Sequence, residues 1–191
     1  MSYLNKKYLV FDFDGTIDSL IIDWNNSIKE MMIIIRDVAN DQSLEVNGNS
    51  YAFQTEMIKK FGDELSERLI ELAKNYEREN YSSHHPNINI VNFIKNNQDK
   101  YKFFLWTSNH IETISPVLRE LGLDQSFQVI ISRDSVKYPK PDADGFSHIF
   151  ISGTEKEDYL MIGDTNNDVF AAKNSGIDYL DVNDFEKEIT R

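Results

Sequence analysis

The sequence contains no cysteine. Disulfides and thiolate metal sites are therefore excluded, and the redox state of the compartment stays open. Basic residues are also few, 20 Lys and Arg against 32 Asp and Glu, which gives a net charge of −12. We expect no nucleic-acid partner, because phosphate backbones bind basic surfaces. If the substrate is an anion, the site must reverse this charge locally, which a divalent cation and one or two lysines could do.

Long apolar runs are absent too. The longest, residues 31–35, is far shorter than the ~20 residues that span a bilayer, and the N-terminal segment lacks the apolar centre of a signal peptide. We therefore expect no membrane partner and a cytoplasmic location. Hydrophobic residues make up 40% of the 191-residue chain, enough for one core with a small appendage. The sequence indicates no oligomeric state.

The second half of the chain alternates between apolar strands and helices. Strands are expected at residues 7–13, 102–106, 128–132, 159–162 and 178–182, with helices between them at 88–96, from about 110 to 121, at 142–151 and at 168–174. This order predicts an α/β fold, a Rossmann-like parallel sheet core with helices on both faces. From residue 17 to about 81 the apolar residues instead recur at helical spacing, with no strand signal between them. That block predicts a small helical domain.

Polar residues follow the predicted strands at their carboxyl ends, where parallel sheets bind ligands. They are Asp12 and Asp14, then Thr107, Ser108 and Asn109, then Lys140, and finally Asp164 and Asp168. Acidic groups at the end of a buried strand are costly unless a cation pairs with them. Carboxylate oxygens of this kind suit Mg²⁺, whereas zinc would favour histidine ligands that these motifs do not offer.

These segments resemble the four motifs of the haloacid dehalogenase (HAD) superfamily, in its phosphatase type similar to phosphoglycolate phosphatase. DFDGT at 12–16 resembles the first motif, Thr107 the second, Lys140 in KPDADGF the third, and GDTNND at 163–168 the fourth. The resemblance assigns residues 1–17 and 86–191 to the α/β core domain. It assigns residues 18–85 to a helical cap domain, joined to the core by two short linkers.

The resemblance implies a magnesium-dependent phosphatase that hydrolyses a small phosphorylated metabolite through an aspartyl-phosphate. Asp12 would attack phosphorus, and Asp14 would serve as acid and base and offer its backbone carbonyl to the metal. Asp164 would hold the Mg²⁺, with Asp168 binding it directly or through water. Mg²⁺ would bridge Asp12 and the phosphoryl group.

The remaining motif residues would bind the phosphoryl oxygens. Thr107 would donate a hydrogen bond and Lys140 would balance the negative charge. Ser108 and Asn109 either contact the substrate or only cap the helix that follows. His110 could reach the substrate or be structural.

Two other functions stay open. One is a phosphomutase of the same superfamily, and the other is a non-catalytic HAD-like binding module, which would predict damage to a motif residue. No such damage is present.

Outside the motifs, His84 and His85 are expected in a solvated hinge, and Gly145 is expected to loosen the helix after Lys140. Specificity is expected to reside in the cap, where the basic candidates for leaving-group contacts are Arg36, Lys59, Lys60, Arg68 and Arg78.

Overall fold

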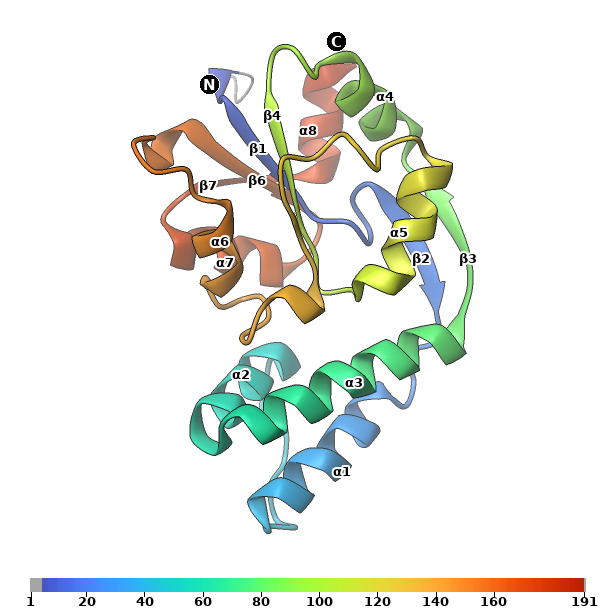
Figure 1. Ribbon diagram of the computed structural model, residues 1–191, viewed down its shortest axis with the longest axis vertical. Helices are drawn as coiled ribbons and strands as arrows, with labels where there is room; N and C mark the ends of the chain where they lie inside the picture. The colour runs from blue at the N-terminus through green and yellow to red at the C-terminus, as the bar shows by residue number, and fades with distance from the viewer. Residues whose placement is uncertain (1–4, 191) are drawn as a thin grey trace.

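The computed structural model describes residues 5–190 (Figure 1). Residues 1–4 and 191, which are predicted to belong to the core domain, lie outside this range. The start of the N-terminal segment, in which no signal peptide is predicted, lies outside it too. Among the described residues, no helix has both the length and the apolar character that crossing a membrane requires.

A five-stranded sheet forms the centre of the molecule. Its strands are β1 (Tyr8–Phe11), β4 (Lys102–Trp106), β5 (Ile130–Ile131), β6 (Tyr159–Gly163) and β7 (Asp178–Asp181), in the spatial order β5-β4-β1-β6-β7. All neighbouring strands are parallel. The sheet confirms the predicted α/β class. Its central strand β1 ends at Phe11, which places the start of the first motif between the ends of β4 and β6.

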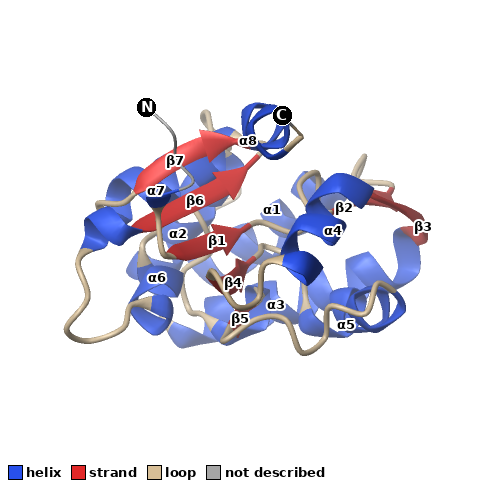
Figure 2. Cartoon of the chain, turned by 90° about the horizontal axis from the view of Figure 1, so that it is seen from above, coloured by secondary structure: helices blue, strands red, loops and turns tan. Residues whose placement is uncertain are grey.

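Helices cover both faces of the sheet, as predicted (Figure 2). Leu9 and Phe11 point to the face that packs against α4 (Ile88–Asn96), α5 (Ile111–Glu120) and α8 (Val182–Ile189). Val10, between them, points to the face that packs against α6 (Asp144–Ile149) and α7 (Asn166–Ser175). The alternation of side chains along a strand therefore divides the core into two apolar layers.

Three further helices lie together beyond one end of the sheet (Figure 1). They are α1 (Ser27–Ala39), α2 (Ser50–Phe61) and α3 (Asp63–Asn80). Their apolar faces enclose a cluster of their own, built from Met31, Met32, Ile35, Met57, Ile58, Leu65 and Leu69. The helices predicted within residues 18–85 are thus present, while the division into two domains at residues 17/18 and 85/86 stays a prediction.

The segments that join these helices to the sheet differ from the prediction. β2 (Asp18–Ile22) and β3 (Tyr81–Pro86) pair as an antiparallel ribbon, where helix and short linkers were expected. Burial alternates along β2, with Leu20 buried and Ile21 exposed, which is the period of a strand. The expectation of no strand in this block is wrong because Ile21 also stands three residues before Trp24, a spacing that imitates a helix.

Candidate active site

Three carboxylates meet at the carboxyl ends of β1 and β6. One oxygen each of Asp12, Asp164 and Asp168 lies within 4.8 Å of the other two. Asp12 and Asp168 are buried, and Asp164 is exposed. Such a set of hard oxygen donors fits Mg²⁺, which takes carboxylates together with waters and substrate oxygens. The structure thus brings together these three of the four predicted metal-binding residues.

Lys140 neutralises part of this charge. Its Nζ lies 2.9 Å from Asp12 Oδ1 and also contacts Asp168 Oδ1, and the side chain is 2% exposed. Burial alone would lower the pKa of Lys140, but the Asp12 and Asp168 carboxylates outweigh it and hold the pKa above its usual range. The ammonium group is therefore a fixed positive charge within the carboxylate cluster.

The carboxylates nevertheless outnumber the positive charge. Burial, followed by the nearby Asp168 carboxylate, raises the pKa of Asp12 to about 7, although Lys140 opposes this shift. The same two causes raise the pKa of Asp164 to about 6. A divalent cation among these oxygens would favour their ionised forms. The raised pKa values and the set of oxygen donors therefore both indicate a divalent cation as the ligand.

The Asp14 side chain is placed apart from the three-carboxylate cluster. It accepts a hydrogen bond of 2.8 Å from the backbone N–H of Leu20, on β2, and it also lines the cavity described below. Burial raises the pKa of Asp14. A carboxyl group that is separate from the three-carboxylate cluster and protonates more readily than usual has the properties of a general acid.

The second motif is internally hydrogen bonded. The Thr107 hydroxyl donates to Asn109 Oδ1 at 2.9 Å, and the Asn109 backbone N–H donates to Thr107 Oγ1 at 3.1 Å. The N-cap of α5 is His110, whose ring nitrogen accepts the backbone N–H of Glu112. Capping by Ser108 or Asn109, one of the two roles considered for them, is therefore wrong. Both line the cavity instead, whereas His110 is buried outside its lining.

Gly145, after the third motif, has a packing role. A methyl group at this position would approach Trp106 Nε1, on β4, to 2.2 Å. Glycine thus lets α6 pack directly on Trp106, and the expectation that it merely loosens the helix misses this contact. The helix itself is shorter than predicted and begins at Asp144, not at residue 142.

A cavity of about 340 Å³ lies between the three-helix unit and the sheet. Asp12, Asp14 and Lys140 form part of its wall, and the helical unit closes it from the other side. The residues contributed by the helical unit include Met31, Tyr51, Gln54, Leu72, Tyr76 and Glu77. This volume suits a small molecule, with the polar groups converging at the strand ends.

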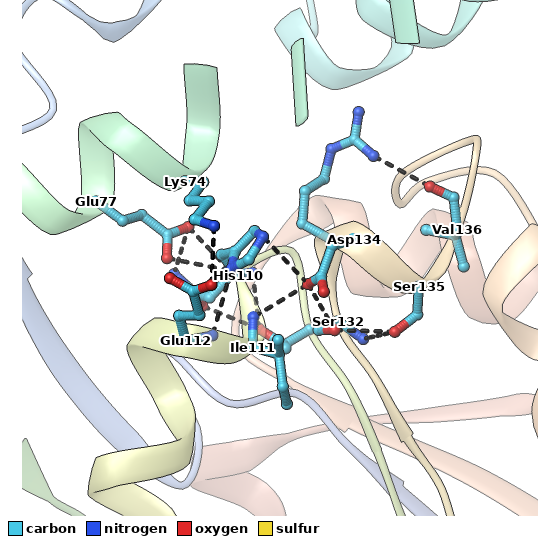
Figure 3. Close-up of polar contacts among 12 residues, drawn as sticks. Lys74, Glu77, His110, Ile111, Glu112, Ser132, Asp134, Ser135 and Val136 are labelled. Carbon is cyan, nitrogen blue, oxygen red and sulfur yellow. Dashed lines mark hydrogen bonds and ion pairs between the residues drawn. The ribbon is translucent and has the colours of Figure 1, made fainter. Parts of the chain in front are cut away.

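Sequence reasoning missed Glu77, a buried carboxylate on α3. Glu77 Oε2 accepts the backbone N–H of His110 at 3.0 Å, so the helical unit is hydrogen bonded to the start of α5 (Figure 3). Burial raises the pKa of Glu77 to about 7, against the hydrogen bonds that it accepts. A single Glu within a helical stripe carries no sequence signal for such a contact, because its partner is a backbone group far along the chain.

Sequence reasoning also missed Arg133, which follows β5 and lines the cavity. Within residues 5–190, none of the basic residues proposed for the cap lines it; the basic side chains that do are Arg133 and Lys140, both from the core. One signal was available for Arg133, since it stands just beyond the carboxyl end of a strand, like the motif residues.

The family model of haloacid dehalogenase-like hydrolases matches residues 9–182 of this chain. The chain therefore belongs to the haloacid dehalogenase-like hydrolase family. This membership confirms the family that the four motifs indicate.

Named relatives agree with that assignment. Pyrophosphatase PpaX of Listeria monocytogenes serotype 4a (strain HCC23) is 28% identical over 183 residues, which cover 87% of this chain and 78% of the relative. Pyrophosphatase PpaX of Halalkalibacterium halodurans is 28% identical over 117 residues, 58% of this chain and 54% of the relative, so this match spans about half of that relative's length. The relatives' names are those of phosphatases, which confirms the expected type of enzyme.

A solved structure shares the fold. The structure described as a predicted phosphoglycolate phosphatase from Haemophilus somnus 129pt superposes with a TM-score of 0.56 at 20% sequence identity, covering 93% of this chain and 85% of that chain.

Proposed function

We propose that this protein is a magnesium-dependent phosphatase that hydrolyses a small phosphomonoester through an aspartyl-phosphate. One observation carries the proposal: oxygens of Asp12, Asp164 and Asp168 lie within 4.8 Å of one another, and Lys140 Nζ lies 2.9 Å from Asp12. A nucleophile, a set of metal ligands and a charge-balancing lysine would thus be gathered at the strand ends, where Asp12 and Lys140 also line the cavity. Phosphoryl transfer depends mainly on such positioning and charge neutralisation.

In the first step, an oxygen of Asp12 attacks phosphorus in line. A bond forms between this oxygen and phosphorus while the bond from phosphorus to the ester oxygen breaks. Asp14 gives its proton to the departing ester oxygen, a role that its raised pKa favours. Lys140 stays protonated beside Asp12 and offsets the negative charge of the phosphoryl group.

In the second step, Asp14, now ionised, takes a proton from water, and the resulting hydroxide attacks phosphorus. The bond from phosphorus to Asp12 breaks and inorganic phosphate leaves. Asp12, Asp164 and Asp168 would hold Mg²⁺, which when bound supplies the positive charge that lets a carboxylate approach a phosphoryl dianion.

The size and enclosure of the cavity support a small substrate. The helical unit lines the cavity opposite Asp12 and Asp14, and the cavity of about 340 Å³ would accommodate a phosphorylated metabolite but not a folded phosphoprotein. Closure of the helical unit over the strand ends would also keep bulk water away from the aspartyl-phosphate while the leaving group is bound. The names of relatives make pyrophosphate and phosphoglycolate the first compounds to assay.

The test is release of phosphate from p-nitrophenyl phosphate with and without Mg²⁺, by the wild type and by Asp12→Asn. The variant should fold and lose roughly three orders of magnitude or more in kcat, because it removes the nucleophile. Asp99→Asn, the same change at an exposed position on the core, is the control and should keep wild-type turnover. An Asp12→Asn protein with the wild-type rate would refute the covalent mechanism.

Two further measurements separate the alternatives. Acid quenching during turnover should trap a phosphorylated protein that hydroxylamine cleaves, which a non-catalytic binding module would never give. Sugar phosphates should yield free phosphate, whereas a phosphomutase would return an isomer.

Replacing Asp14 should slow the hydrolysis of esters with poor leaving groups far more than that of p-nitrophenyl phosphate, whose leaving group needs little protonation. Equal losses for both kinds of ester would contradict the acid role of Asp14.

A further inference from the structure

Arg133 places a second positive charge in the cavity wall. It begins the short 3-10 turn Arg133–Ser135 after β5, and its side chain lines the same cavity as Asp12 and Lys140. The residue is only 2% exposed. Burial lowers the pKa of Arg133 to about 10, so the guanidinium still carries its charge at neutral pH. A buried charge of this kind is costly unless an anion compensates it.

The protein itself supplies only neutral partners at hydrogen-bond distance. Arg133 Nη1 donates to the Val136 carbonyl at 3.2 Å, and Nη2 donates to Gln54 Oε1, on α2, at 3.1 Å. Across residues 5–190, none of the ion pairs within 4.0 Å includes the Arg133 guanidinium. This contrasts with Lys140, the other cation of the cavity, which contacts two carboxylates.

Two acidic residues of the same region, Asp134 and Glu77, have hydrogen-bond partners of their own (Figure 3). The Asp134 carboxylate accepts the Ser132 hydroxyl at 2.9 Å and the backbone N–H of Ile111 at 3.1 Å. The Glu77 carboxylate accepts the backbone N–H of His110. Both carboxylates therefore bond to the start of α5. The Asp134 charge still acts on Arg133 from a distance, but neither carboxylate forms an ion pair with it, so the guanidinium can accept an anion from the cavity.

The surroundings of Arg133 are suited to bind oxygen atoms of a ligand. A guanidinium carries more N–H donors than its two bonds to Val136 and Gln54 use, and its planar fork matches a carboxylate or phosphate. Tyr51, also on α2, lines the cavity, and the charges of Glu77, Lys140, Arg133 and Asp12 all act on its hydroxyl. A further hydroxyl donor thus stands in the same cavity wall as Arg133 and Asp12.

We infer that Arg133, held by Gln54, binds a second anionic group on the leaving-group part of the substrate. The substrate is then a small phosphate ester or anhydride that carries a carboxylate or a second phosphoryl group beyond the one transferred. This inference rests on the proposed function for its chemistry. It assigns specificity to a core residue that approaches the cap, and not to a basic residue of the cap itself.

Three esters with the same carbon skeleton test the inference. Phosphoglycolate and ethylene glycol bisphosphate carry the second anion as a carboxylate or as a phosphoryl group, and 2-hydroxyethyl phosphate carries a neutral hydroxyl. The wild type should show a kcat/KM at least about tenfold higher for one of the charged esters, as expected when a buried charge pairs with its ligand. The preferred charged ester shows whether the second anionic group is a carboxylate or a phosphoryl group.

Variants then connect the preference to the residue. Arg133→Met should reduce the ratio of kcat/KM for the preferred ester over that for 2-hydroxyethyl phosphate by about tenfold or more. Gln54→Leu should reduce it less, because it only releases the guanidinium. Arg119→Met, the same loss of charge at an exposed position on α5, should leave the ratio unchanged. Equal losses for all three esters in Arg133→Met would mean a structural role and would overturn the inference.

Binding gives a readout that does not depend on turnover. Calorimetric titration of Asp12→Asn in Mg²⁺ with each ester should show the same order of affinities, and the order should disappear when Arg133→Met is added. Absence of turnover with a preserved preference in binding would reject the proposed function alone. If a protein with Arg133 intact hydrolyses or binds the esters without preferring a charged one, the second-anion site is rejected. This outcome does not depend on whether Arg133→Met folds.

Discussion

The carboxylate of Asp164 lies directly against the backbone of Gly15. A methyl group at Gly15 would approach Asp164 Oδ2 to 2.2 Å, and the residue has a φ of 79°, which L side chains rarely adopt. The glycine of the first motif therefore does two things at once. It turns the chain from β1 toward β2, and it makes room for the Asp164 carboxylate, a proposed metal ligand, at the end of β6.

Gly15→Ala should abolish metal-dependent activity, because the new methyl group displaces Asp164. We expect kcat for p-nitrophenyl phosphate to fall by about a hundredfold or more, with a higher Mg²⁺ concentration needed for half-maximal rate. Gly48→Ala is the matched control, since Gly48 has a φ of 83° with no atom within 4 Å of the added methyl group. Both variants carry the strain of positive φ, about 1–2 kcal/mol. Equal activities of the two variants would contradict the proposed packing.

Stability of the metal-free protein should decrease as pH rises from about 4 to about 7. The pKa of Asp12 is raised from 3.8 to about 7 and that of Asp164 from 3.8 to about 6, so in this window the folded state holds protons that the unfolded state has released. Mg²⁺ binds the ionised carboxylates and should reverse the loss. The increase in Tm on adding Mg²⁺ should therefore be larger near pH 8 than near pH 5. An increase independent of pH would contradict this assignment of the metal ligands.

The sequence predicted the parts of the site that follow from topology. Asp12 and Asp164 stand at the ends of apolar segments, and parallel strands bring such ends to one edge of the sheet. Glu77 was not predicted to contribute, because its role depends on the backbone group that the fold places opposite it. Arg133 was also missed, although its place just beyond a strand end was a signal for it. The β2–β3 ribbon was missed for a different reason: within a few residues, the strand period around Ile21 cannot be distinguished from helical spacing.

Glu77→Gln should become more stable than the wild type as pH rises. The pKa of Glu77 is raised by burial from 4.5 to about 7, so ionisation costs the folded state stability between about pH 4.5 and pH 7. Glutamine avoids that ionisation, and its carbonyl oxygen can still accept the backbone N–H of His110. The Tm of Glu77→Gln relative to wild type should increase from pH 5 to pH 8.

Glu79→Gln is the control for this measurement. It makes the same change on the same helix at an exposed position, and its Tm should follow that of the wild type at every pH. A Glu77→Gln protein that loses stability relative to wild type as pH rises would show that the ionised carboxylate is favoured by the start of α5 and that burial does not dominate.

His84→Gln should destabilise the protein mainly at acidic pH. His84 Nδ1 lies 2.7 Å from Oδ2 of the buried Asp18 carboxylate, across the ribbon that joins the helical unit to the sheet. This hydrogen bond raises the pKa of His84 above its ordinary 6.5, so the expected solvated hinge is instead ion-paired when the ring is protonated. The stabilisation is fully present below about pH 6.5 and is lost as pH rises through the higher pKa of the folded state.

The Tm difference between wild type and His84→Gln should therefore be largest near pH 6 and shrink toward pH 9, where a neutral imidazole and an amide are both uncharged partners for Asp18. His85→Gln changes the adjacent, exposed histidine and should show no such trend. Because the pair lies in the ribbon between the helical unit and the sheet, we also expect His84→Gln to raise KM more at pH 6 than at pH 9. A difference in Tm that stays constant from pH 6 to pH 9 would contradict the ion pair.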